Sequence, residues 1–163
     1  MATSVCKIED IFESLIAKES IFRSSLLGCN SDEINFVEKH FECVLPAEYR
    51  CFLHIAGRAA GKIFQGTDIF YPRILELKDE AQVLLVELDV AHLLPADAKI
   101  FCMHQGYEIN YFLPGSNDPP IFQFFEGQSS VSQPWASFSE YFRTSIEDHL
   151  TQWLDLNKEG TWK

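Results

Sequence analysis

Residues 44–57, VLPAEYRCFLHIAG, carry the pattern that decides the fold. Pro46 suits the first position of a helix, because its missing N–H would have no partner there. Gly57 tolerates the left-handed conformation that closes many helices. The stretch therefore predicts a short amphipathic helix between Pro46 and Gly57, and it contains no catalytic motif. Its apolar face is formed at helical spacing by Tyr49, Phe52, Leu53 and Ala56.

The residues before this stretch also follow helical patterns. An apolar stripe that runs from Ile8 to Ile16 and then weakens predicts an N-terminal helix within residues 5–27. Gly28 to Asn30 reads as a break, and Ser31 is a suitable N-cap for a second helix. The first third of the chain is thus predicted to be helical.

The remaining residues predict strands with one inserted helix and one closing helix. Gln105-Gly106 suits a tight hairpin turn, and residues 128–134 form a Ser/Gln loop. The predicted strands are Thr67–Tyr71, Ile100–His104, Tyr107–Leu113 and Ile121–Phe125. The inserted helix is expected at Lys78–Leu94, and a capping box at Ser137–Glu140 opens a closing helix that extends through Leu154.

This order predicts an α+β fold: a mostly antiparallel sheet, with N-terminal helices and a closing C-terminal helix packed on it. The 163 residues fit a single domain, 1–163, with a core at about 31–155. The N-terminal helix within 5–27 is expected to be packed on that core or appended to it. Fourteen phenylalanines predict a core rich in aromatic rings.

Negative charge dominates the sequence, with a formal net charge of −11. Residues 76–126 contain nine acidic and two basic residues, so this segment carries −7 of that total. Such a balance argues against nucleic acid as a direct partner, because phosphates require basic contacts. It fits a basic protein partner, although negative charge also simply maintains solubility. The candidate partner-binding residues are Glu76, Glu80, Glu87, Asp89, Glu108, Glu126 and Trp135.

The cysteines and the hydropathy indicate a compartment. Five cysteines occur, an odd number without a C-x-x-C pair, at Cys6, Cys29, Cys43, Cys51 and Cys102. Free thiols in a reducing cytosol are the simplest interpretation. No signal peptide is recognisable, and no apolar run approaches the ~18 residues of a membrane span. The sequence therefore predicts a cytoplasmic protein without a membrane partner.

Residues with catalytic potential do not form a recognisable set. Cys102 and His104 would share one face of a strand, which is a start for a zinc site, but zinc requires three or four ligands. The five histidines are scattered, so no Cys–His nucleophile stands out. The three glycines of Gly57–Gly66 do not match a phosphate-binding loop and indicate a connection. We expect no catalytic, cofactor-binding or metal-binding residues and no enzymatic activity.

Three blocks of the sequence resemble the SUKH superfamily. The first is Ile34–Gly57, with Leu45-Pro46 and Tyr49 at its centre. The second is the predicted sheet, Ile100–Glu126, and the third is Ala136–Phe142, which reads ASFSEYF. The blocks span most of residues 31–155. The family often has Asn-Gly at the helix end, where this chain has Ala56-Gly57.

The resemblance implies a binding protein of α+β fold rather than an enzyme. Bacterial members of the superfamily look like immunity proteins that neutralise toxins, many of them nucleases. An acidic protein suits that role, because it can mimic nucleic acid at a basic active site. The expected partner is therefore a basic toxin domain. The alternative is a regulatory or scaffold module of the yeast Smi/Knr type that binds cellular proteins.

Overall fold

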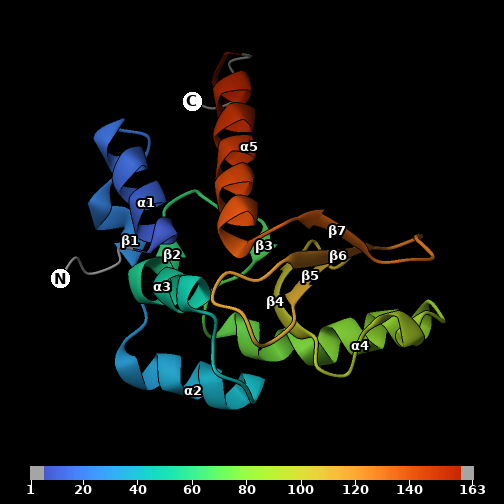
Figure 1. The fold of residues 1–163 in the computed structure, drawn as a ribbon. Coiled ribbons are helices and arrows are strands. Elements are labelled where there is room, and N and C mark those ends of the chain that lie inside the picture. Colours follow the sequence, from blue (N-terminus) through green and yellow to red (C-terminus); the bar gives the residue numbers. More distant parts are fainter. Residues whose placement is uncertain (1–5, 159–163) are drawn as a thin grey trace.

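The computed structural model describes residues 6–158, with side chains placed for residues 6–152. Five strands form an antiparallel sheet whose order follows the chain, β3-β4-β5-β6-β7 (Figure 1). Gln105 and Gly106 both have positive φ and form the turn between β4 and β5, as the sequence predicted. The bounds of the strands are Thr67–Asp68, Lys99–His104, Glu108–Phe112, Ile121–Phe125 and Ser132–Trp135.

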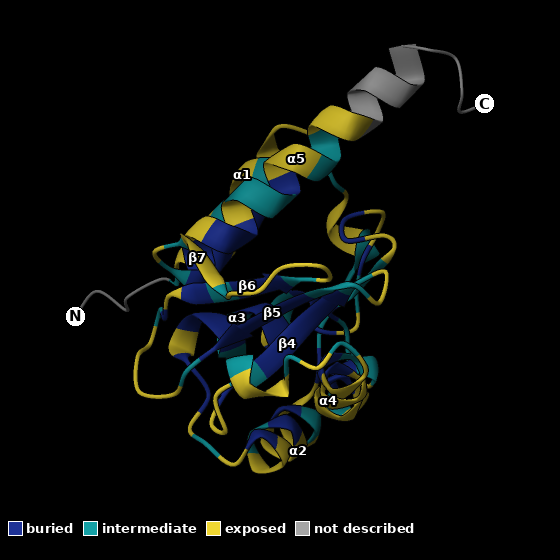
Figure 2. Cartoon of the chain, turned by 90° about the vertical axis from the view of Figure 1, so that its right-hand side faces the viewer, coloured by how far each residue is buried: buried dark blue, intermediate teal, exposed yellow. Residues whose placement is uncertain are grey.

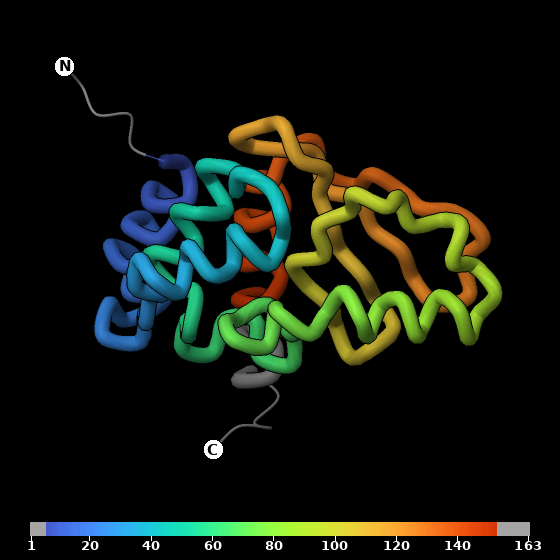
Figure 3. Tube along the Cα trace, turned by 90° about the horizontal axis from the view of Figure 1, so that it is seen from below, coloured from blue at the N-terminus to red at the C-terminus, as the bar shows by residue number. Residues whose placement is uncertain are grey.

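Helices cover both faces of this sheet. Helix α4 (Leu77–Glu87) lies under one face, and α5 (Phe138–Lys158) rises over the other (Figures 1 and 2). This layout confirms the predicted α+β class. The N-terminal helices gather at one end of the sheet (Figure 3): α1 (Lys7–Ala17), α2 (Ser31–Phe41) and α3 (Ala47–Ala56). Within residues 6–158, no helix combines the length and the apolar character that crossing a bilayer requires.

Shorter elements connect these helices and strands. Strands β1 (Leu26–Leu27) and β2 (Ala59–Ala60) pair as a separate two-stranded sheet beside α3. Three turns of 3₁₀ helix lie at Arg23–Ser25, Arg73–Glu76 and Ala91–Leu93.

Aromatic rings join α3 to the sheet and to α5, as the phenylalanine content predicted. The ring of Tyr49 in α3 is fully buried, with its centroid 5.5 Å from that of Phe112 and 5.6 Å from that of Phe138. The rings of Phe52 and Phe142 are 5.4 Å apart. Each such pair contributes roughly 0.5–1.5 kcal/mol beyond the area that it buries. The core therefore sits where α3, α5 and the sheet meet (Figure 2).

The helix predicted between Pro46 and Gly57 is present, but its end was predicted for the wrong reason. Pro46 is the N-cap, and Gly57 is right-handed, with φ −63°. A Cβ at Gly57 would lie 2.5 Å from the carbonyl oxygen of Leu53 and 2.6 Å from Sγ of Cys29. Glycine is thus required by a close approach of neighbouring atoms and not by a left-handed backbone.

Carboxylate and amide side chains bond the N-terminal N–H groups of α1, α2 and α5. Asn30, and not Ser31 as predicted, caps α2 and forms a capping box with Glu33. Glu48 of α3 is buried and accepts bonds from the first two N–H groups of α1, each at 3.1 Å. Asp118 accepts from the amide and the hydroxyl of Ser139 at the start of α5. These long-range caps fix the entry of two helices onto the core.

Several element boundaries differ from the prediction. Helix α1 ends at Ala17, ten residues before the predicted limit at residue 27, and residue 5 lies outside the described part of the chain. Helix α4 ends at Glu87 instead of Leu94, because Asp89 adopts a φ of 57° that terminates the helix.

The strands also differ at two places. The strand predicted at Thr67–Tyr71 stops at Asp68, and the amide of Tyr71 donates instead to the carbonyl of Gly57. The loop predicted at residues 128–134 contains the start of β7, because Ser132 pairs with Gln123 of β6.

The prediction of five free thiols is wrong for two of them. Cys6, just before α1, forms a disulfide with Cys51 of α3, and their Cα atoms are 6.7 Å apart. The separation of 45 residues concealed this pairing in the sequence. Cys29, Cys43 and Cys102 are free thiols. Because a disulfide is typical of oxidising environments, the cysteines no longer argue for a reducing compartment.

Candidate functional site

The structure separates the predicted partner-binding residues into two groups. Glu80 and Glu87 lie on α4, with Glu76 just before it and Asp89 just after it. Glu108 at the start of β5 and Trp135 at the end of β7 line a cleft on the opposite face of the sheet. Glu126 is exposed in the turn after β6 and belongs to neither group. The candidate residues therefore do not form one continuous surface.

The first candidate surface is the acidic ridge, which we define as Glu76, Asp79, Glu80, Glu87 and Asp89. All five residues are exposed. Arg73 forms ion pairs with Glu76 and Glu80, both at 2.5 Å. Hydrogen bonds to these two carboxylates raise the pKa of the Arg73 guanidinium. Within the described chain, no ion pair neutralises Asp79, Glu87 or Asp89, so the ridge keeps an excess of negative charge.

Two valines lie within the acidic ridge. Val83 is 57% exposed and Val86 is 67% exposed. Asp79, Val83 and Val86 follow the i, i+4, i+7 spacing, so they share the outward face of α4. The inward face of α4 is held on the sheet by the buried residues Leu77, Ala81 and Leu85. The ridge thus presents apolar contact area bordered by acids, an arrangement that occurs at docking surfaces.

The second candidate surface is the polar cleft, a cavity of about 320 Å³ between α5 and the sheet. Its floor is a row of polar side chains across three strands, because Cys102 pairs with Asn110 and Asn110 pairs with Gln123 in the register. Asn110 is 1% exposed and Gln123 is 8% exposed. Buried amides of this kind persist only where they are hydrogen-bonded.

Hydrogen bonds link this row to Glu108. The amide nitrogens of Asn110 and Gln123 donate to Oε1 of Glu108 at 3.0 and 2.7 Å. The amide nitrogen of Gln123 also donates to Oδ1 of Asn110 at 3.1 Å. Beside Glu108, the Nδ1 atom of His104 lies 2.8 Å from the hydroxyl oxygen of Thr67. The carboxylate of Glu108 is therefore held in one orientation at the edge of the cleft.

The thiol of Cys102 is shielded from chemistry. The hydroxyl of Tyr141 donates to its sulfur at 3.3 Å, and burial raises the pKa of Cys102 to about 12. At neutral pH the group is the protonated thiol, which is a poor nucleophile and metal ligand. Cys102 and His104 line the same cleft, but within the described chain no group of three potential ligands is placed to hold a metal ion.

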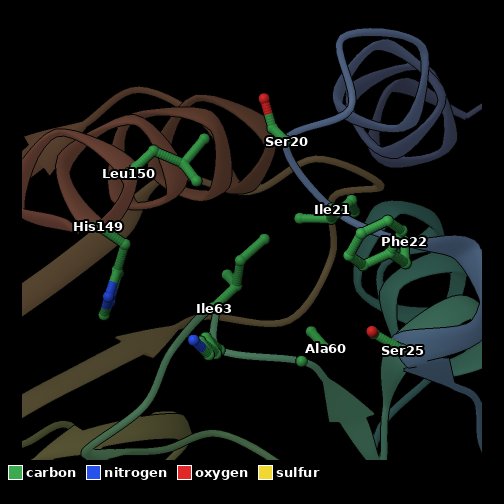
Figure 4. A pocket seen from close by; sticks show the side chains of 10 residues that line it. Ser20, Ile21, Phe22, Ser25, Ala60, Ile63, His149 and Leu150 are labelled. Carbon is green, nitrogen blue, oxygen red and sulfur yellow. The ribbon is translucent and has the colours of Figure 1, made fainter. Parts of the chain in front are cut away.

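A smaller cavity of about 190 Å³ lies between α5, residues 20–25 and residues 60–63 (Figure 4). Its wall is mainly apolar, with Ile63 and Leu150 projecting toward each other and Ile21 beside them. His149 lines both cavities, and burial lowers its pKa. The small cavity offers few polar groups to orient a ligand, whereas the cleft offers many.

Of the residues that line the cleft, only Glu108 and Trp135 were predicted from the sequence as binding residues. Asn110, Gln123, Asp148 and His149 also line it and were not predicted. One signal was available: Glu108 and Asn110 are two residues apart in a strand, so they share a face. The pairing with Gln123 depends on the register of β5 and β6, which the sequence alone does not give.

A comparison with known protein families gives one match. The model described as "SMI1 / KNR4 family (SUKH-1)" matches residues 28–144. The matched region runs from just before α2 into α5 and includes the acidic ridge and the floor of the polar cleft. No curated protein matches the sequence. The family match supports a protein-binding or immunity-type role in general.

Proposed function

The chain belongs to the SMI1/KNR4 family (SUKH-1), and we propose that it is a non-enzymatic immunity protein that neutralises a bacterial toxin. The toxin domain docks on the acidic ridge. The observation that carries this proposal is the outward face of α4, where Val83 and Val86 lie among exposed acids.

Charge determines which partner fits this surface. Asp79, Glu87 and Asp89 have no cation partner in the described chain, so a basic surface would gain ion pairs without breaking existing ones. Complementary charges also accelerate encounter, an effect that added salt suppresses. A nuclease toxin presents such a basic surface where it binds phosphate. Docking of the ridge at that place would exclude the nucleic acid.

The two valines give the ridge an apolar centre. Val83 and Val86 expose apolar area to water, and burial against a partner would remove that area from solvent. Charged residues around them form a rim, as in many non-obligate interfaces. The surface therefore suits reversible binding of another protein.

The buried thiol of Cys102 supports a role without catalysis. Its high pKa keeps the group protonated, and Asn110 and Tyr141 occupy it with hydrogen bonds. The amides of the cleft hold a carboxylate in place but supply no nucleophile. We propose recognition, and not bond breaking, as the function of both surfaces.

The test begins with the tagged 163-residue chain, which is expressed as bait in cells of the organism that encodes it. Bound proteins are recovered at low and high salt and identified by mass spectrometry. The proposal predicts a basic toxin domain that is lost at high salt. Co-expression then shows whether the chain protects a host from that domain.

Two results would contradict parts of the proposal, the first the immunity role and the second the docking surface. Ordinary cellular proteins without toxicity would favour the regulatory or scaffold module of the Smi/Knr type. A toxin that binds equally at all salt concentrations would exclude the acidic ridge as its docking surface.

A further inference from the structure

In the polar cleft, the carboxylate of Glu108 accepts hydrogen bonds through only one of its two oxygens within the described chain. Oε1 of Glu108 accepts bonds from Asn110 and Gln123, while Oε2 has no donor among the described residues. Gln123 is more than nine-tenths buried, and its carboxamide oxygen also lacks a donor within the described chain. Two acceptors thus remain available in a cavity of about 320 Å³.

Two histidines, His104 and His149, line the cleft, but within the described chain its lining contains no lysine or arginine. Glu108 and Asp148 also line the cleft. No ion pair to Glu108 or Asp148 occurs in the same part of the chain. Hydrogen bonds from Asn110 and Gln123 engage Oε1 of Glu108, and a donor on a ligand could engage Oε2. The cleft is therefore suited to a ligand that is positively charged and rich in N–H donors.

Aromatic rings restrict the shape of that ligand. Trp135 and Tyr141 meet edge to face at the side of the cleft, with ring centroids 4.9 Å apart. A flat cation gains both cation–π attraction on such rings and paired hydrogen bonds to a carboxylate. The guanidinium group combines these properties, whereas an ammonium group is compact and strongly hydrated.

We propose that the polar cleft binds an arginine side chain presented by a protein, with its guanidinium group on Glu108. This inference rests on the proposed protein-binding function in one respect: that function implies that the arginine belongs to a protein partner. Glu108 supplies the charge, Gln123 supplies an additional acceptor, and Trp135 supplies a stacking surface. The amides of Asn110 and Gln123 position Glu108 before the ligand arrives, which reduces the ordering that binding requires.

The test uses the full chain, isotopically labelled, and N-acetyl-arginine-N-methylamide as a probe in an NMR titration. We expect saturable shifts in the millimolar range at the amides of Glu108 and Gln123 and at the indole N–H of Trp135. The citrulline analogue has the same shape without the charge, and we expect it to cause no such shifts. Shifts of equal size with citrulline would overturn the proposal.

Two variants locate the site. Glu108→Gln keeps an oxygen that accepts from both amides but removes the charge, so at least tenfold weaker binding of the probe is expected. Glu126→Gln removes an acid outside the cleft and should leave the titration unchanged. Equal binding to the Glu108→Gln variant would exclude the cleft. Free L-arginine that binds much more tightly than the blocked probe would indicate an amino-acid ligand and would also overturn the proposal.

Failure of this inference is distinguishable from failure of the proposed function. Absence of probe binding, with a basic toxin still captured in a salt-dependent manner, would reject the arginine site and leave the acidic ridge intact. Probe binding without any captured toxin would reject the immunity role and leave the arginine site intact.

Discussion

The two faces of the five-stranded sheet are covered in opposite ways. Helix α4 lies flat on one face and buries Leu77, Ala81 and Leu85, so only its outward side remains for binding. Helix α5 rises from the other face and leaves a cleft floored by Asn110 and Gln123. The outward side of α4 thus carries the acidic ridge, whereas the face under α5 contains the polar cleft. The way in which a helix packs on each face therefore determines whether the recognition surface there is an exposed helix side or a cleft.

The largest effect on stability is expected from a substitution that disrupts the packing of α4 on the sheet. Leu77→Ala removes a side chain with 0% exposure beneath α4. Loss of its transfer free energy, together with the cavity left behind, should lower the free energy of unfolding by about 3 kcal/mol. Urea denaturation followed by circular dichroism measures it. A loss below about 1 kcal/mol would mean that α4 is not anchored by apolar packing.

The next effect concerns the polar face. Asn110→Ala leaves Glu108 with one donor instead of two and removes the acceptor for Gln123. Unsatisfied buried groups should reduce the free energy of unfolding by about 2 kcal/mol. Asn117→Ala, in the exposed loop before β6, is the control and should change it little. Equal losses in the two variants would argue against a structural role for the amide row.

The same contrast explains what the sequence could and could not predict. The helix between Pro46 and Gly57 and the hairpin at Gln105-Gly106 follow from local patterns, and both are present. The cap that Glu48 provides to α1 joins residues 40 or more positions apart, and no local pattern encodes it. The disulfide of Cys6 with Cys51 is hidden for the same reason.

The residues of the candidate site show more clearly what can and cannot be predicted from the sequence. The acids around α4 could be found by counting charges, because exposed charge needs no tertiary partner. Gln123 and Asp148 become part of a site only after β6 and α5 are placed beside β5. Phe122 and Phe124 flank Gln123 in the sequence, and such aromatic residues led us to interpret this strand as core.

A smaller effect sharpens the role of the ridge. Val83→Ala with Val86→Ala removes exposed methyl groups, so the free energy of unfolding should change by less than about 0.5 kcal/mol. Affinity for the protein partner should fall about tenfold, because each methyl buried in an interface contributes up to ~0.8 kcal/mol. Val44→Ala, at a valine 81% exposed outside α4, is the control for isothermal titration calorimetry. Undiminished affinity in the double variant would place docking elsewhere.

The smallest expected effect is a pH dependence of the folding stability that arises from His149 beside the cleft. Burial, and next the charge of His104, lower the pKa of His149 in the folded protein, while Asp148 opposes the shift. The unfolded chain therefore binds a proton at this histidine more readily than the folded chain does. The contribution of neutral His149 to the free energy of unfolding is fully present above about pH 6.5, the unperturbed histidine pKa. It decreases as the pH falls from there to the lower folded pKa. His149→Phe should flatten this part of a pH series of melting temperatures, and an unchanged slope would assign the dependence to another group.

Docking of a basic protein partner on the acidic ridge should be visible in the kinetics of association. The most direct measurement is the association rate of the purified partner by stopped flow, over a series of salt concentrations. The ridge variant is Asp79→Asn with Glu87→Gln, and the control is Asp10→Asn with Glu147→Gln, which changes the net charge equally outside the ridge. The account predicts a rate about threefold lower for the ridge variant at low salt, and equal rates for both variants at high salt. Equal rates for the two variants at low salt would contradict it.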